Sequence, residues 1–462
     1  MSGDSSGPPT QPSIDNAAAR ALIVGAMVGV GVFLAPGRMA RAVPDGGVQL
    51  ALWLLGALGA LGGTLAYAAW ARRMPRSGGD AVFQTAAWGP GAGALTGALL
   101  FFGAFCGSNA TLAAALGEYQ APAALGLVEG WPPSGLHLGP LGPNKLVALF
   151  VIIVLSVIQA QGMRVSLGLQ RALSAAPVVA FALLSVGVLG AAAYGLLPLP
   201  PPAPPAPVTA QGLLSGWLAA HFAFAGWTSA AYMAGELRDP GAGLRRASVQ
   251  GVLLVSGLYF AIVGALLVGL GVPELAAAGE AGSALAQKLG GPLAARAMAA
   301  LIGVGLLGTI HATLFGGARV AVALAEGGLL PRGLIPPVGV PPRRALVLQA
   351  AVIAALLLSG SADGLLDAVA LIMICIGTMT VTGLYRCLLR GAPPAAWPAR
   401  LAEALGPLDL ALISLHLLLG LVALGVELHG ALLGEAGAAP LLWAGGFTAL
   451  WLLAQRRGPS TS

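Results

Sequence analysis

The chain has 462 residues, of which 57% are hydrophobic and only 9% are charged, and its mean hydropathy is +0.86. A soluble domain does not need so much apolar surface, so this composition excludes that class and indicates an integral membrane protein. The net charge of +6 is explained below by the loops on one side of the membrane, so it does not indicate nucleic-acid binding.

The first segment, residues 1-16, is polar and rich in serine and proline. It has neither a basic region followed by an apolar core nor a small-residue cleavage site, so it predicts a disordered cytoplasmic tail and not a signal peptide.

Apolar stretches long enough to cross a membrane follow. A bilayer core about 30 Å thick needs about 20 helical residues, and twelve stretches approach or exceed that length. They are 17-43, 48-71, 81-117, 145-161, 166-193, 210-236, 243-271, 294-325, 343-359, 362-388, 407-427 and 436-455.

Two of these stretches are interrupted by glycine at matching places, in Val24 to Leu34 (VGAMVGVGVFL) and in His221 to Ala231 (HFAFAGWTSAA). Lipid cannot hydrogen-bond to an interrupted backbone, so a broken helix is tolerated only where protein or a bound solute satisfies its N–H and C=O groups. The two breaks therefore mark the expected substrate site.

Positive charge predicts the orientation, because cytoplasmic loops retain Lys and Arg. With the amino terminus inside, and with Arg20 and Arg319 set aside within helices, 16 basic residues fall on the inner side and 5 on the outer side. Both termini are therefore expected in the cytoplasm, including the tail 456-462.

The spans also divide into two similar sets of five. Helices 1-5 cover 17-193 and helices 6-10 cover 210-388, joined by a proline-rich outer connector, 194-209. Because five is odd, the second set would lie inverted relative to the first. Helices 11-12, within 389-455, would stand outside the repeat.

Three segments carry a family resemblance: Val24 to Pro36, Gly62 to Gly91 (GGTLAYAAWARRMPRSGGDAVFQTAAWGPG) and Phe222 to Pro240 (FAFAGWTSAAYMAGELRDP). Together with Leu307 to Pro331, they resemble the amino acid-polyamine-organocation superfamily, and particularly its L-amino-acid transporter branch. The resemblance implies an all-α, twelve-helix membrane transporter with a LeuT-type five-plus-five inverted repeat and discontinuous helices 1 and 6. A bacterial cytoplasmic (plasma) membrane is the expected location.

The resemblance also implies a binding site. The first-helix Gly-Ser-Gly break of the family corresponds to Gly29, Val30 and Gly31, whose N–H groups would receive a substrate carboxylate. In helix 6, carbonyls beside Phe222 would accept from the substrate ammonium, and Phe222 matches an aromatic gate. The implied substrate-binding residues are Val28, Gly29, Val30, Gly31, Phe222, Ala223, Phe224, Ala225, Gly226 and Thr228. Close helix packing by the glycines, and ordinary packing by Phe222 and Trp227, are the alternatives.

The absence of acidic residues from the two breaks limits the class of substrate. An unpaired charge at the bilayer midplane costs at least about 2.5 kcal/mol, and the breaks contain no Asp or Glu. A neutral amino acid therefore fits better than arginine or a polyamine. A cationic amino acid or polyamine carrier remains an alternative, as does an amino acid sensor that uses the same fold without transport.

The chain differs from many relatives at the position that is expected to couple transport to an ion. Many relatives carry a fifth-helix lysine at the end of a pattern that aligns with Leu173 to Pro177, and proline cannot titrate. His311 and His221 are candidates to carry a proton instead, because histidine titrates near neutrality. The alternative for each is a neutral histidine that bonds to a helix carbonyl.

An inner gate, whose ion pairs would break when the site opens inward, is expected from charged residues on the cytoplasmic side: Arg72, Arg73, Arg76, Glu236, Arg238 and Asp239. Solvated charges of basic cytoplasmic loops are the alternative, and Glu236 is singled out because the family usually has an acid there. Trp227 is expected at the gate with Phe222. The segment Tyr67 to Ala71 lacks the acid that the family usually has in its second helix.

Other functional classes lack support in the sequence. There is no His-x-x-x-His metal pair, no Gly-x-Ser-x-Gly elbow and no phosphate loop, so neither an enzyme nor a cofactor or metal is expected. The outer loop 120-144 has no cysteine, so no disulfide-linked partner subunit is expected. An amino acid, membrane lipid and protons are the expected partners.

Overall fold

The computed structural model is helical throughout the residues that it describes. These are 14–29, 31–127, 142–200, 207–229, 231–239, 241–337, 339–359, 362–389 and 405–432. Within them, the β-type pairing is confined to an isolated bridge between Ile14 and Leu237.

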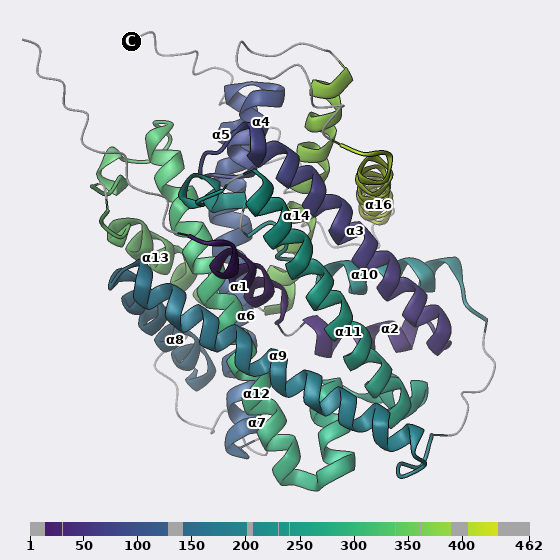
Figure 1. Ribbon diagram of the computed structural model, residues 1–462. Helices are drawn as coiled ribbons and strands as arrows, with labels where there is room; N and C mark the ends of the chain where they lie inside the picture. The colour runs from purple at the N-terminus through teal and green to yellow at the C-terminus, as the bar shows by residue number, and fades with distance from the viewer. Residues whose placement is uncertain are drawn as a thin grey trace, which may run out of the picture.

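Within the described ranges, short turns join each helix to the next (Figure 1). The α-helices are α1 (Asn16–Met27), α2 (Gly31–Ala42), α3 (Gly46–Arg73), α4 (Asp80–Trp88), α5 (Pro90–Ala98), α6 (Cys106–Ala115), α7 (Ala121–Leu125), α8 (Pro143–Ala160), α9 (Met163–Ala193), α10 (Ala210–Ala223), α11 (Ala242–Ala277), α12 (Ala281–Glu326), α13 (Arg343–Ser359), α14 (Ala362–Leu389) and α16 (Pro407–Leu432). Two π-helical turns, η1 (Leu99–Phe105) and η2 (Leu116–Gln120), join α5 to α7, and two short 3₁₀ helices are η3 (Ala231–Glu236) and η4 (Arg332–Leu334).

Eight helices in the described part of the chain are long and apolar enough to cross a membrane, and nine if α1 and α2 form one bent span. The protein is therefore an integral, multi-pass membrane protein. The twelfth predicted span, 436-455, lies outside the described residues, so the number twelve stays a prediction.

The third predicted span, 81-117, has the wrong bounds. Gly89, with φ at +100°, ends α4 at Trp88, and a separate helix begins at Pro90 and continues to Leu125. Proline at the first helical position favours this start, because its missing N–H would have no partner there. The helix α4 and the beginning of the 90–125 span pack against each other as a hairpin.

The described part of the chain begins at Ile14, within the predicted tail 1-16. The backbone of Ile14 accepts from Arg238 and donates to Glu236, each at 3.1 Å, and the Ile14 side chain is buried. Asp15 then caps α1 by accepting from the Ala18 N–H at 2.7 Å. The amino-terminal end of α1 is thereby attached to the end of η3.

The helices differ in how much of their surface is buried. The most apolar windows of α3 and of the 90–125 span are mostly buried, whereas less than a third of the corresponding windows of α8, α9 and α16 is buried. Apolar side chains that face outward on a membrane protein meet lipid, so α8, α9 and α16 form part of the lipid-facing surface. In Figure 1, α9 and α11 cross the front of the molecule, and α1 lies between them in this view.

A buried carboxylate joins four elements beside the bundle interior. Asp80, at the start of α4, accepts hydrogen bonds from the hydroxyls of Tyr67 on α3, Thr380 on α14 and Tyr232 on η3. The Tyr232 bond is 2.8 Å long and the Thr380 bond 2.6 Å. The sequence analysis missed this acid, which lies in the segment after the second helix and not within that helix.

Replacing Asp80 with asparagine should change how thermal stability depends on pH. Burial raises the pKa of the Asp80 carboxyl above its ordinary value, although the three donated hydroxyls lower it. The folded protein therefore binds this proton more readily than the unfolded chain does, and the unfolding free energy of the wild type rises by up to about 1.4 kcal/mol per pH unit as the pH falls through the folded pKa. The apparent Tm of the purified wild type minus that of Asp80→Asn should grow between pH 8 and pH 5.

The matched control is Asp409→Asn, which removes an ion pair with Arg245 at the bundle surface. Its Tm difference from the wild type should not widen on acidification. A constant or shrinking difference for Asp80→Asn would show that Asp80 remains ionised in the folded protein over this pH range.

Candidate functional site

The first predicted break lies between α1 and α2. The Val28 N–H closes the last turn of α1 on the Val24 carbonyl at 2.8 Å, and the Gly29 N–H donates to the Met27 carbonyl at 2.9 Å. The α2 helix then begins at Gly31. Val30 lies outside the described residues. Because the Gly29 N–H is used within the chain, the donors available to a ligand are those of the first turn of α2, which lack intrahelical acceptors.

The second predicted break separates α10 from η3. The α10 helix ends at Ala223, and the turn residues that follow include Gly226, whose φ is +104°. The Phe222 carbonyl accepts from the Ala225 N–H at 3.0 Å. The carbonyl of Gly226 accepts from both the N–H and the hydroxyl of Ser229.

The two breaks lie against each other, although about 190 residues separate them in the sequence. A Cβ at Gly31 would lie 3.0 Å from the Cα of Ala223, and a Cβ at Gly226 would lie 2.5 Å from the Ala26 carbonyl oxygen. Both glycines therefore permit direct backbone contact. Figure 1 shows α2 and α10 side by side.

Tyr259 of α11 bridges the two breaks. Its hydroxyl lies 2.6 Å from the Met27 carbonyl and 3.1 Å from the Ala223 carbonyl, which end α1 and α10 respectively. The side chain is fully buried. One hydroxyl thus serves the carboxyl ends of both half-helices, where the helix dipoles concentrate negative partial charge.

Thr309 of α12 serves the first break in the same way. Its hydroxyl oxygen lies 3.0 Å from the Gly25 carbonyl and 3.4 Å from the Val28 carbonyl. A Cβ at Gly29 would lie 2.9 Å from that oxygen, so a glycine is needed there for close approach. Sequence reasoning missed both Tyr259 and Thr309, because each is a single polar residue inside a long apolar helix.

The predicted aromatic residues divide between two places. Phe224 is fully buried against Trp53 and Tyr259, with ring centroids 5.8 and 5.1 Å away. Trp227 packs instead between Tyr67 of α3 and His416 of α16. Phe222 is partly exposed, whereas Ala223 and Thr228 are buried. The structure therefore brings Phe224 and the glycines together and leaves Trp227 on the far side of the turn.

A large cavity lies among the segments that follow α3 and α12. Its volume is about 1570 Å³, and residues from 74–94, 159–166, 235–236, 315–329 and 335–346 line it. We call it the vestibule. Among the predicted site residues that the structure describes, Glu236 alone lines it.

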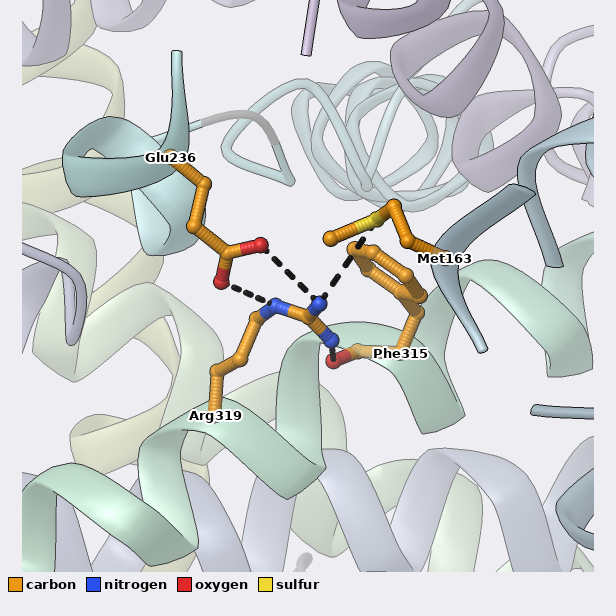
Figure 2. A network of polar contacts seen from close by, with 4 residues as sticks. All are labelled: Met163, Glu236, Phe315 and Arg319. Carbon is orange, nitrogen blue, oxygen red and sulfur yellow. Dashed lines mark hydrogen bonds and ion pairs between the residues drawn. The ribbon is translucent and has the colours of Figure 1, made fainter. Parts of the chain in front are cut away.

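Glu236 forms a two-pronged ion pair with Arg319 inside the vestibule (Figure 2). The Arg319 Nε lies 2.5 Å from one carboxylate oxygen and Nη2 lies 3.0 Å from the other. The guanidinium also donates to the Phe315 carbonyl at 2.9 Å and lies over the Phe315 ring. The partner of Glu236 is thus Arg319, which the sequence analysis set aside as a residue within a helix and did not include in the expected inner gate.

The two candidate coupling histidines occupy different surroundings. His311 of α12 is fully buried, with Nδ1 2.8 Å from the Gln170 side-chain oxygen and Nε2 3.3 Å from the Ser166 hydroxyl. His221 of α10 is partly exposed, and its ring lies beside that of Trp217. His311 thus belongs to a polar network, whereas the ring contact of His221 is with an aromatic residue.

Comparison with known proteins adds an independent observation. A family model described as amino acid permease matches residues 17–397. The serine/threonine exchanger SteT of Bacillus subtilis (strain 168) is 27% identical over 314 residues, 67% of either chain. The branched-chain amino acid permease BcaP of Lactococcus lactis subsp. cremoris is 29% identical over 330 residues, 68% of either chain. The human large neutral amino acids transporter small subunit 2 is 25% identical over 319 residues, 67% of this chain and 57% of that protein.

Replacing Gly226 with alanine should destabilise the contact between the breaks. The new Cβ would meet the Ala26 carbonyl at 2.5 Å, and a positive φ costs a non-glycine residue about 1–3 kcal/mol. We expect a clearly lower apparent Tm in detergent, measured with the variant and wild type side by side.

The control is Gly187→Ala on α9, where a Cβ meets nothing within 4 Å. Alanine is the better helix former, so this variant should be as stable as the wild type or slightly more stable. Equal Tm values for Gly226→Ala and Gly187→Ala would contradict the close packing described here.

Proposed function

The chain belongs to the amino acid permease family of the amino acid-polyamine-organocation superfamily, and we propose that it transports neutral L-amino acids by alternating access. The family and the relatives above are transporters and not enzymes. Transport as a proton symporter or as an exchanger is the proposed mode of operation. The observation that carries the proposal is the contact between two interrupted helices, Gly31 against Ala223 and Gly226 against Ala26.

The half-helices present complementary partial charges to a zwitterion. The α2 helix begins at Gly31 with N–H groups that lack intrahelical acceptors, which suits a carboxylate. The α10 helix ends at Ala223 beside Phe224, and a helix carboxyl end suits an ammonium group. In the proposed complex, the two breaks, which are in contact in this structure, move apart, and the substrate spans from the start of α2 to the end of α10.

The substrate side chain is proposed to be neutral. The described residues of the two breaks carry no charged group, and Asp80 already accepts three hydroxyls from other elements. The names of the three relatives refer to serine and threonine, to branched-chain amino acids and to large neutral amino acids. Both observations favour a neutral substrate over a cationic amino acid or a polyamine.

The vestibule is proposed to face the cytoplasm. It opens among segments that follow α3 and α12, where the sequence places basic residues such as Arg76 and Arg332, and basic loops face the cytoplasm. With this orientation both termini are cytoplasmic, and the Glu236–Arg319 pair stands on the inner route as a gate. The repeat of 17-193 and 210-388, with its 194-209 connector and the 389-455 helices outside it, remains part of the proposal.

Purified protein should be stabilised selectively by neutral amino acids. A ligand that binds the native state alone raises apparent stability by an amount that grows with its concentration, about 2.7 kcal/mol at 100 times Kd. The measurement is a thermal-shift screen of the twenty amino acids and common polyamines. Stabilisation by arginine or polyamines alone would contradict the neutral site, and flux of a labelled ligand into proteoliposomes would separate a transporter from a sensor.

Replacing Gly31 with leucine should abolish this stabilisation while the folded protein remains extractable. The side chain would enter the contact with Ala223, where a Cβ already lies 3.0 Å from the Cα. Gly187→Leu, on the exposed side of α9, is the control and should respond to ligand as the wild type does. Wild-type affinity in Gly31→Leu would mean that the first break serves packing alone.

A further inference from the structure

A chain of buried polar side chains runs between α9, α12 and α1, beside the first break. His311 lies between Ser166 and Gln170, and Gln170 continues to Ser174 at 2.9 Å. The Ser174 hydroxyl donates to the Ala21 carbonyl of α1 at 3.2 Å. All four side chains are at least nine-tenths buried. We call this chain the polar relay.

The hydrogen-bond partners of Gln170 determine which atoms of the relay donate and which accept. The Gln170 amide nitrogen lies 3.2 Å from the Gly308 carbonyl, which can only accept, so the amide oxygen must be the atom that faces His311. An amide oxygen requires a donor, and His311 therefore carries its hydrogen on Nδ1. The lone pair of the neutral imidazole is then on Nε2, which faces the Ser166 hydroxyl.

Ser166 connects this lone pair to the vestibule. Ser166 lines the vestibule wall together with Gln159, whose side-chain amide donates to the His311 carbonyl at 2.6 Å. The Nε2 atom of His311 is thus separated from the vestibule by one hydroxyl. A serine hydroxyl can pass on its own proton and take another from water, because it is both donor and acceptor.

The other end of the relay contacts the backbone of α1. A Cβ at Gly25 would lie 2.0 Å from the Gln170 nitrogen and 2.3 Å from the Ser174 oxygen, so the α1 backbone lies directly on these side chains. The α1 helix ends at Met27, where the proposed substrate site begins. A change in the charge of His311 therefore acts on the half-helix that borders the substrate.

The groups that face His311 do not themselves titrate. The α9 helix presents Ser166 and Gln170, α8 presents Gln159, and α1 is reached through Ser174. The charged residues on the vestibule wall are Arg76, Glu236, Arg319 and Glu326, of which Glu236 and Arg319 pair with each other. No carboxylate among the described residues contacts the imidazole, so in this arrangement the ring is neutral.

We propose that Nε2 of His311 is the site at which a co-transported proton binds, with Ser166 as its connection to the vestibule. This inference rests on the proposed transport function and names its coupling ion. On binding, Nε2 gains a proton from water through the Ser166 hydroxyl, Nδ1–H stays donated to Gln170, and the ring becomes an imidazolium. Pro177, which lies beside Gly305, cannot serve in this role because proline has no titratable side chain.

The test uses the full-length protein in proteoliposomes with a neutral amino acid selected by thermal shift. Three quantities are measured: counterflow of labelled substrate at equal pH, uptake driven by an acid-outside gradient, and acidification of the lumen reported by pyranine. A gradient of one pH unit limits accumulation to about tenfold for one proton per substrate. We expect the wild type to show all three activities.

His311→Asn should retain counterflow within about twofold and lose both gradient-driven accumulation and lumen acidification. Ser166→Ala, a smaller change, should retain counterflow and slow the acidification. His416→Asn is the matched control: His416 is also buried and bonds to the Gly59 carbonyl at 2.7 Å, outside the relay. It should keep its proton coupling.

Several outcomes would overturn the proposal. Gradient-driven uptake in His311→Asn that equals that of the wild type would overturn it. So would gradient-driven uptake that is lost in His221→Asn and retained in His311→Asn. Unchanged acidification in Ser166→Ala would exclude the route from the vestibule. Wild-type counterflow without acidification would remove the proton site and leave the proposed function standing, whereas absence of wild-type counterflow with any neutral amino acid would overturn both.

Discussion

A helix that is interrupted within a membrane must find hydrogen-bond partners inside the protein, because lipid offers none. This constraint explains the contacts around the two breaks. The Tyr259 hydroxyl lies within hydrogen-bond distance of the last carbonyls of α1 and α10, and Thr309 lies against two carbonyls at the first break. Close contact at Gly31 and Gly226 then shields the interrupted backbone, so glycine is required on both sides. The partial charges of the helix ends remain directed toward one point, which is what an amino acid zwitterion needs.

The same arrangement links the centre to the vestibule. The α1 half-helix is bonded at its start to the end of η3 and along its length to the polar relay. The η3 segment in turn carries Glu236, whose partner Arg319 lies on α12, the helix that also carries His311. Movement of α1 would therefore disturb both the segment that carries the ion pair and the relay. Substrate, gate and proton can be coupled by such contacts without any long-range signal, since each contact joins neighbouring elements.

Sequence reasoning located the interrupted helices because glycine within an apolar stretch is a local signal, and it identified the family from motifs around them. It placed the start of the third span wrongly, since the turn at Gly89 looks like one more glycine in an apolar run. Sequence reasoning could not predict which residues from distant helices contact each other. Whether Asp80, Tyr259 or Arg319 is buried, and against what, depends on how distant helices pack. No spacing in the chain encodes that packing.

The most direct test of the central claim is a density map of the protein with a stabilising amino acid bound. The account predicts density between the start of α2 at Gly31 and the end of α10 at Ala223, with the carboxylate toward Gly31 and the ammonium toward the Ala223 and Phe224 carbonyls. Ligand density confined to the vestibule beside Arg319, with the two breaks still packed together, would contradict the assignment of the breaks as the substrate site.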